Sequence, residues 1–193
     1  MKLYLIRHGQ STANLGKLYM GQTDVPLTEE GRQQAMSIRP ILENIPFDKV
    51  FTSDLQRAVD TQKLALPNAK APVRTKLLRE VDVGKLMGTP LGELKAPDDP
   101  QYPKHRDYSP FDGECFSMVR DRATAFLDSL LADPCENVAV FSHFGFLCCM
   151  TQLMMETEMA NGRTPIPNCG ILVFEHDGTY WKLRAWNYGI KEV

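Results

Sequence analysis

The sequence lacks the marks of a disulfide-stabilised or zinc-binding protein. Its five cysteines form an odd set with no C-x-x-C spacing, whereas a disulfide framework needs pairs and zinc sites use closely spaced ligands. We therefore interpret the cysteines as small hydrophobic residues of the interior. They are Cys115, Cys135, Cys148, Cys149 and Cys169.

It also lacks a long apolar run and a large net charge. No hydrophobic stretch approaches the roughly 18 residues that a membrane span needs, and Met1 leads directly into an alternating segment without the pattern of a signal peptide. The 22 basic and 24 acidic residues give a net charge of −2, which creates no field to attract nucleic acid or anionic lipid. We expect a cytoplasmic protein with no nucleic-acid or membrane partner.

The chain contains enough hydrophobic residues to form one core. With 193 residues and a hydrophobic content of 43%, residues 1–193 are expected to form a single domain that buries roughly 70% of its unfolded surface. Residues 84–114 combine prolines and glycines without sustained periodicity, which predicts a variable excursion over the surface. Loops of this kind often carry function, so we expect this one on the substrate side.

Strands alternate with helices along the sequence. The predicted strands are residues 2–7, 49–52, 73–77, 138–141, 170–174 and 180–186, with the turn signal Asp177-Gly178 between the last two. The predicted helices are residues 28–45, a segment after 53 that ends before Pro67, residues 115–130, and a segment that starts near 144. This alternation predicts an α/β fold, a three-layer α/β/α sandwich with a mainly parallel central sheet and an antiparallel C-terminal edge hairpin.

Two helix ends have recognisable signals. Thr28 is a suitable N-cap for the helix 28–45, and Pro40 should kink that helix or end it early. The next helix should be capped by Ser53 or Asp54.

Charged side chains follow three of the predicted strands. The first strand ends in Arg7-His8-Gly9, the second leads through Ser53 to Arg57, and the strand 138–141 ends in Ser142-His143. In such sheets ligands bind beyond the carboxyl ends of the strands. A single Arg or His is more often a surface charge or a satisfied core group, but three strands that end alike favour one shared site.

Two guanidinium groups and two imidazoles at one site suit an anion. Tetrahedral phosphate fits because each guanidinium can donate a two-pronged hydrogen bond. The sequence has no G-x-x-x-x-G-K-[ST] nucleotide loop and no carboxylate cluster to hold magnesium. Charge neutralisation should therefore come from the side chains, with no metal ion and no cofactor, and histidine is the available nucleophile.

The residues of this site lie within longer segments that resemble the blocks of the histidine phosphatase superfamily, also called phosphoglycerate mutase-like (branch 1). The blocks are Leu5-Ile6-Arg7-His8-Gly9-Gln10-Ser11 with Asn14, then Asp24-x-Pro26-Leu27-Thr28-x-x-Gly31-x-x-Gln34-Ala35, Ser53-Asp54-Leu55-x-Arg57-Ala58, Leu78-Arg79-Glu80, Gly113-Glu114 and Ser142-His143. They occur in the family's order from residue 3 to about residue 150 and together are far more specific than R-H-G alone.

The resemblance implies a role for each matching residue. His8 would attack phosphorus and Glu80 would protonate the leaving group, without a metal. The groups that would hold the phosphoryl oxygens are Arg7, Asn14, Gln22, Arg57 and His143. For Glu80, a salt bridge to Arg79 or a lysine remains the structural alternative.

The function expected from these residues is a metal-independent phosphatase that hydrolyses a small-molecule phosphomonoester through a phosphohistidine. Two alternatives stay open: a cofactor-dependent phosphoglycerate mutase that uses the same histidine, and a non-catalytic phosphate-binding module. Leu86-Met87 stands where many members have an aromatic residue followed by glutamate, so the substrate is not fixed. The protein is expected to be a monomer or a homodimer.

Overall fold

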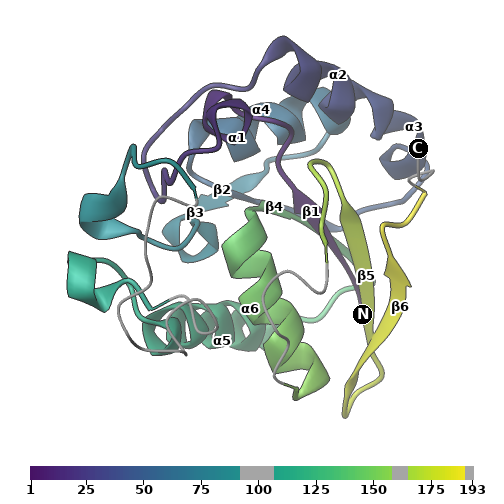
Figure 1. The fold of residues 1–193 in the computed structure, drawn as a ribbon. Coiled ribbons are helices and arrows are strands. Elements are labelled where there is room, and N and C mark those ends of the chain that lie inside the picture. Colours follow the sequence, from purple (N-terminus) through teal and green to yellow (C-terminus); the bar gives the residue numbers. More distant parts are fainter. Residues whose placement is uncertain (92–106, 158–164, 190–193) are drawn as a thin grey trace.

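The computed structural model describes residues 1–91, 107–157 and 165–189, and within these ranges the chain forms a six-stranded sheet flanked by helices (Figure 1). The strands are β1 Lys2–Arg7, β2 Lys49–Ser53, β3 Val73–Thr75, β4 Asn137–Ser142, β5 Ile171–His176 and β6 Trp181–Trp186, in the order β3-β2-β4-β1-β5-β6. The helices are α1 Thr12–Gly16, α2 Glu29–Ser37, α3 Arg39–Leu42, α4 Gln56–Ala65, α5 Phe116–Ala132 and α6 Phe144–Met155.

The sheet is mainly parallel and ends in an antiparallel hairpin, as the sequence predicts. Strands β1, β2, β3 and β4 run in one direction, whereas β5 lies antiparallel to β1 and β6 antiparallel to β5. In the hairpin turn, Asp177 Oδ1 accepts hydrogen bonds of 2.9 Å from the N–H groups of Thr179 and Tyr180. The parallel strands therefore all carry their carboxyl ends to one edge of the sheet.

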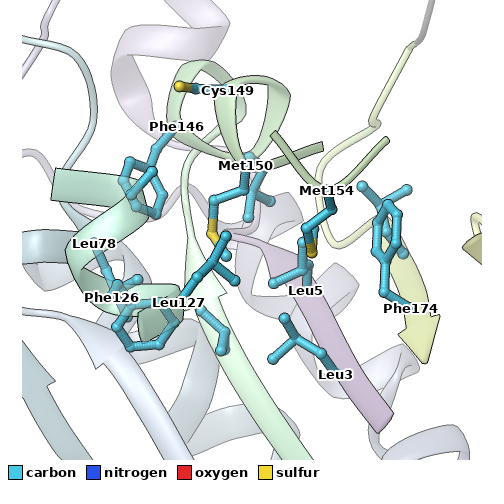
Figure 2. Close-up of a cluster of buried hydrophobic side chains, with 14 of the residues drawn as sticks. Leu3, Leu5, Leu78, Phe126, Leu127, Phe146, Cys149, Met150, Met154 and Phe174 are labelled. Carbon is cyan, nitrogen blue, oxygen red and sulfur yellow. The ribbon is translucent and has the colours of Figure 1, made fainter. Parts of the chain in front are cut away.

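Helices cover both faces of the sheet (Figure 1). Alternate residues of β1 belong to different cores: Leu3 and Leu5 pack in the cluster with α5 and α6, whereas Tyr4 and Ile6 pack in the cluster with α2, α3 and α4. Figure 2 shows Leu3 and Leu5 with the side chains of α5 and α6 around them. Because successive strand residues point to opposite faces, a strand stretch buried on both sides is apolar without interruption, as β1 is from Leu3 to Ile6.

The predicted helix 28–45 is divided in two. Thr28 is the N-cap of α2, and its Oγ1 accepts a hydrogen bond of 3.0 Å from the Gly31 N–H. Helix α2 ends at Ser37 with Ile38 as its C-cap, and α3 has Pro40 in its first turn, where proline costs no hydrogen bond. Both the cap and the break are as expected.

The predicted cap of the second helix is wrong. Leu55 occupies the N-cap of α4 without a side-chain hydrogen bond, because β2 continues through Ser53 and the helix starts only at Gln56. The Gln56 N–H instead donates to Asp24 Oδ1 at 2.7 Å, so a residue from a distant loop caps this helix.

Two further segments are the short helix α1 and the predicted excursion 84–114. Helix α1 lies where the sequence indicates only a loop, and Ser11 and Asn14 form a reciprocal capping box at its start. The predicted excursion 84–114 lies partly outside the described residues. Its two described ends meet at Gly84, whose φ is +55° and where a Cβ would come within 2.0 Å of the Phe111 carbonyl oxygen, so only glycine fits there.

All five cysteines are free thiols. Cys149 and Cys169 are buried, as interpreted from the sequence, but Cys115, Cys135 and Cys148 are only partly covered. Among the described residues, no helix combines the length and the apolar character required to cross a membrane.

Candidate active site

His8 follows the last residue of β1 and is 4% exposed. Its Nδ1 lies 2.6 Å from the Gly9 carbonyl oxygen. A carbonyl oxygen can only accept a hydrogen bond, so Nδ1 must carry the proton and Nε2 keeps its lone pair. The ring is thus held in the tautomer in which Nε2 can act as a nucleophile.

The peptide of Gly9, which orients the His8 ring, is itself fixed. The Gly9 N–H donates to Thr61 Oγ1 at 3.0 Å, and that hydroxyl donates to the Arg57 carbonyl oxygen at 2.7 Å. A Cβ at Gly9 would lie 2.3 Å from the Gly31 carbonyl oxygen, so no larger residue fits. Thr61 lies one helical turn after Arg57, so the sequence places its hydroxyl near the Arg57 carbonyl but does not reveal its contact with Gly9.

His143 is fully buried at the N-cap of α6, directly after β4. Its Nδ1 accepts a hydrogen bond of 3.2 Å from Arg57 Nε, so the proton resides on Nε2. Among the residues that the structure describes, this buried Nε2 has no hydrogen-bond partner. The centroids of the His8 and His143 rings lie 5.1 Å apart.

Arg57 lies in the first turn of α4 and binds the loop that contains Gly21 and Thr23. It is 3% exposed, and its Nη1 and Nη2 donate hydrogen bonds of 2.8 Å to the carbonyl oxygens of Thr23 and Gly21. With the bond to His143, three of its five N–H groups are occupied. Each terminal nitrogen retains one further N–H.

The cationic surroundings act on both histidines. Burial, followed by the charges of Arg57 and Arg7, holds the pKa of His8 well below 6.5. Burial and Arg57 do the same for the pKa of His143. A buried imidazole beside a guanidinium disfavours a second positive charge, so both rings are neutral in the folded protein.

The Glu80 carboxylate binds the start of helix α6. Its Oε2 accepts from the Gly145 N–H at 3.1 Å, and its Oε1 accepts from the N–H groups of Phe146 at 3.2 Å and Val81 at 2.9 Å. The alternative of a salt bridge to Arg79 is wrong, because Arg79 forms a two-pronged pair with Asp54 through bonds of 2.7 Å. Helix N-termini favour negative charge.

The other three predicted phosphate ligands have partners within the protein. Arg7 Nη1 donates to the Ile166 carbonyl oxygen at 2.6 Å, and its guanidinium lies over the Phe144 ring. Gln22 Oε1 accepts from Arg79 Nη1 at 3.2 Å. Asn14 Oδ1 accepts from the Ser11 N–H at 3.0 Å and from Asn168 Nδ2 at 3.3 Å.

A cavity of about 90 Å³ gathers four of the predicted residues, His8, Asn14, Arg57 and Glu80. Arg7, Gln22 and His143 do not line it. Asn168, which also donates to the His8 carbonyl oxygen at 3.0 Å, has no local sequence signal that would have revealed it.

Among the described residues, no three His, Cys, Asp or Glu side chains are grouped so that they could hold a metal ion. The site combines a neutral imidazole, a guanidinium and a carboxyl group, a set suited to phosphoryl transfer.

Known proteins resemble the chain over most of its length. The model of the histidine phosphatase superfamily (branch 1) matches residues 3–189. An adenosylcobalamin/alpha-ribazole phosphatase of Salmonella typhimurium is 31% identical over 167 residues, which cover 83% of each chain. A 2,3-bisphosphoglycerate-dependent phosphoglycerate mutase of Gloeobacter violaceus is 31% identical over 195 residues, 92% of this chain and 88% of that protein.

A solved structure agrees with these sequence matches. The structure of a mycobacterial glucosyl-3-phosphoglycerate phosphatase superposes with a TM-score of 0.85 at 26% identity, over 96% of this chain and 98% of that one. The named relatives act on different phosphorylated compounds, so the similarity does not fix a substrate. The extent of the family match and the shared fold show that this chain belongs to the histidine phosphatase superfamily, branch 1.

Proposed function

We propose that this protein is a metal-independent phosphatase that hydrolyses a small-molecule phosphomonoester through a phosphohistidine at His8. The observation that carries the proposal is the pair of complementary nitrogens in the site. His8 Nε2 has a lone pair because Nδ1 is bonded to the Gly9 carbonyl, and the buried His143 Nε2 carries a proton with no partner among the described residues.

In the first step, His8 Nε2 forms a bond to phosphorus and the bond from phosphorus to the leaving oxygen breaks. Protonated Glu80 gives its proton to that oxygen, since an alkoxide is a poor leaving group. His143 Nε2–H and the remaining N–H groups of Arg57 donate to the phosphoryl oxygens, where negative charge gathers. Arg7 helps to keep His8 neutral through its charge, and the roles of Arg7, Asn14 and Gln22 at the phosphate remain predictions.

In the second step, a water molecule attacks the phosphohistidine. The Glu80 carboxylate takes a proton from that water, the new oxygen–phosphorus bond forms and the bond to His8 Nε2 breaks. Inorganic phosphate leaves, and both residues return to their starting states. One carboxyl group thus serves as acid and then as base.

Rapid quenching during turnover of p-nitrophenyl phosphate, with a chelator present, tests this proposal. We expect an acid-labile phosphorylated enzyme, with the label on His8, and a loss of activity of about 10⁴-fold or more in His8→Ala. His176→Ala is a matched control, because His176 lies at the opposite end of the sheet, where its backbone N–H donates to the Met1 carbonyl oxygen. A label on another residue, or an active His8→Ala variant, would reject the proposal.

A mutase is the second candidate, and the relative from Gloeobacter violaceus supports it. It would use the same phosphohistidine but return the phosphoryl group to the substrate instead of to water. Interconversion of 2- and 3-phosphoglycerate, stimulated by 2,3-bisphosphoglycerate, with negligible release of inorganic phosphate would favour the mutase. Rapid release of phosphate favours the phosphatase.

A further inference from the structure

Arg122 of α5 binds the backbone of the segment that carries Glu80. Its Nη1 donates to the carbonyl oxygens of Leu77 at 2.9 Å and Arg79 at 2.7 Å, and its Nη2 donates to the Glu80 carbonyl oxygen at 3.1 Å. Three carbonyls within four residues therefore converge on one guanidinium. The position of the Glu80 main chain is set by α5, an element that contributes no residue to the cavity lining.

Glu114 takes the remaining donors of Arg122. Its Oε1 accepts from Arg122 Nε at 2.9 Å and its Oε2 accepts from Arg122 Nη2 at 3.0 Å. All five N–H groups of the guanidinium are then used. The two side chains are each 13% exposed, so the pair is shielded from solvent and its geometry is well determined.

The same pair also holds the chain on the other side of Glu80. Glu114 Oε2 accepts from the Asp82 N–H at 2.8 Å, and the Glu114 N–H donates to the Asp82 carbonyl oxygen at 2.9 Å. The Arg122 guanidinium lies 4.7 Å from the centroid of the Phe146 ring, and the Phe146 N–H is one of the donors to the Glu80 carboxylate. Backbone on both sides of Glu80, and one partner of its carboxylate, are thus tied to one ion pair.

We propose that Arg122 and Glu114 are positioning residues that aim the Glu80 carboxyl group at the leaving oxygen. This inference rests on the proposed function, because it assigns a purpose to the geometry of the proton donor. Lysine cannot replace Arg122, since an ammonium group lacks the planar fork that reaches three carbonyls and a carboxylate together. A displacement of about 1 Å at a reacting group can reduce the rate about 10²-fold.

The test compares two substrates that depend on the proton donor to different degrees. An alkyl phosphate such as glycerol 3-phosphate needs its leaving oxygen protonated, whereas p-nitrophenolate leaves readily as an anion. The quantity kcat/KM reports the steps up to departure of the leaving group, so it isolates the phosphorylation of His8 from the later hydrolysis. We would measure it for Arg122→Lys, Glu114→Gln and Glu80→Gln.

Arg122→Lys should lower kcat/KM for the alkyl phosphate by about 10²-fold, with a much smaller loss for p-nitrophenyl phosphate. Glu114→Gln should show the same selectivity to a lesser degree, because it retains one acceptor oxygen for Arg122. Arg120→Lys is the matched control, an exposed arginine two residues away on the same helix, and should change neither value. The double variant Arg122→Lys with Glu80→Gln should have a kcat/KM for the alkyl phosphate only slightly lower than that of Glu80→Gln alone.

The outcomes separate this inference from the proposed function. Equal losses on both substrates, or effects of Arg122→Lys and Glu80→Gln that multiply, would overturn the positioning role while leaving the phosphohistidine mechanism intact. A wild-type protein without turnover of either substrate would instead remove the proposed function, and the positioning role with it. Thermal unfolding of each variant shows whether it is folded, and a selective loss in a folded variant supports the inference.

Discussion

The two ends of the central sheet each contain a cavity, and the two cavities differ in size and chemistry. The cavity at the carboxyl ends of the strands measures about 90 Å³, whereas the one at the amino end of β2 measures about 320 Å³. The larger cavity lies between residues that precede β2, such as Phe47 and Asp48, and residues that follow α4, such as Leu66. The larger volume therefore does not lie at the end of the sheet where the predicted site residues meet.

Hydrogen bonding distinguishes the two ends more clearly than volume. In the amino-end cavity, Arg39 donates twice to the Leu64 carbonyl oxygen, and Asp48 Oδ2 accepts from two backbone N–H groups at 2.9 Å. At the carboxyl end, the buried His143 Nε2 has no partner among the described residues. A buried donor without a partner is costly, and it is retained where a ligand can bind it.

Helix direction contributes to the same contrast. Helices α4 and α6 begin at the carboxyl end of the sheet, just after β2 and β4, so their positive dipole ends lie near the site. Arg57 lies in the first turn of α4, and Glu80 is bonded to the first N–H groups of α6. The helix N-termini at the carboxyl end thus bind two carboxylates of the protein, those of Asp24 and Glu80.

The largest effect expected from this comparison is at Arg57. Arg57→Lys removes the planar group that links His143 Nδ1 to the carbonyls of Gly21 and Thr23, and lysine cannot make the same bonds. We expect kcat/KM for p-nitrophenyl phosphate to fall by about 10² to 10³-fold. Arg39→Lys, at the amino-end cavity, is the control and should retain activity. Similar losses in the two variants would contradict the distinction between the two ends.

The second expected effect concerns pH. In the unfolded chain, His143 takes up a proton as the pH falls through 6.5, whereas in the folded protein burial and Arg57 hold the pKa of His143 well below that value. The unfolded state then binds more protons, so stability decreases as the pH falls below 6.5 towards the lowered pKa. The pKa of His8 is lowered as well, first by burial, so His8 also reduces the stability as the pH falls below 6.5.

His143→Asn should reduce this loss of stability, because it removes one of the two groups and its Oδ1 can still accept from Arg57 Nε. The measurement is the thermal unfolding midpoint of the wild type and the variant, at a pH above 6.5 and about one unit below it. Equal decreases in the two proteins would show that His143 is not the source of the pH dependence.

The smallest effect is expected at the amino-end cavity itself. Lys70 lines this cavity and is exposed, and no catalytic role is assigned to that end of the sheet. Lys70→Gln should leave kcat/KM unchanged and shift the free energy of unfolding by no more than about 0.5 kcal/mol. A large loss of activity in this variant would indicate that the amino-end cavity takes part in the reaction.

Local sequence patterns predicted most of the fold because they depend on few residues. The strand β1, the Thr28 cap and the break near Pro40 each follow from neighbouring positions. The cap of α4 could not be predicted in this way, because its acceptor, Asp24, lies 32 residues from Gln56. Helix α1 is only five residues long, too short for a periodic pattern to indicate it.

The sequence by itself determined the family, the alternation of strands and helices, and the presence of Arg7, His8, Arg57, Glu80 and His143 in the family's blocks. These features reside in residue types and local spacing. Only the tertiary structure decided which nitrogen of each histidine holds the proton, and that Glu80 binds α6 instead of Arg79. Such contacts join residues far apart in the chain, so their geometry exists only once the sheet and its helices are assembled.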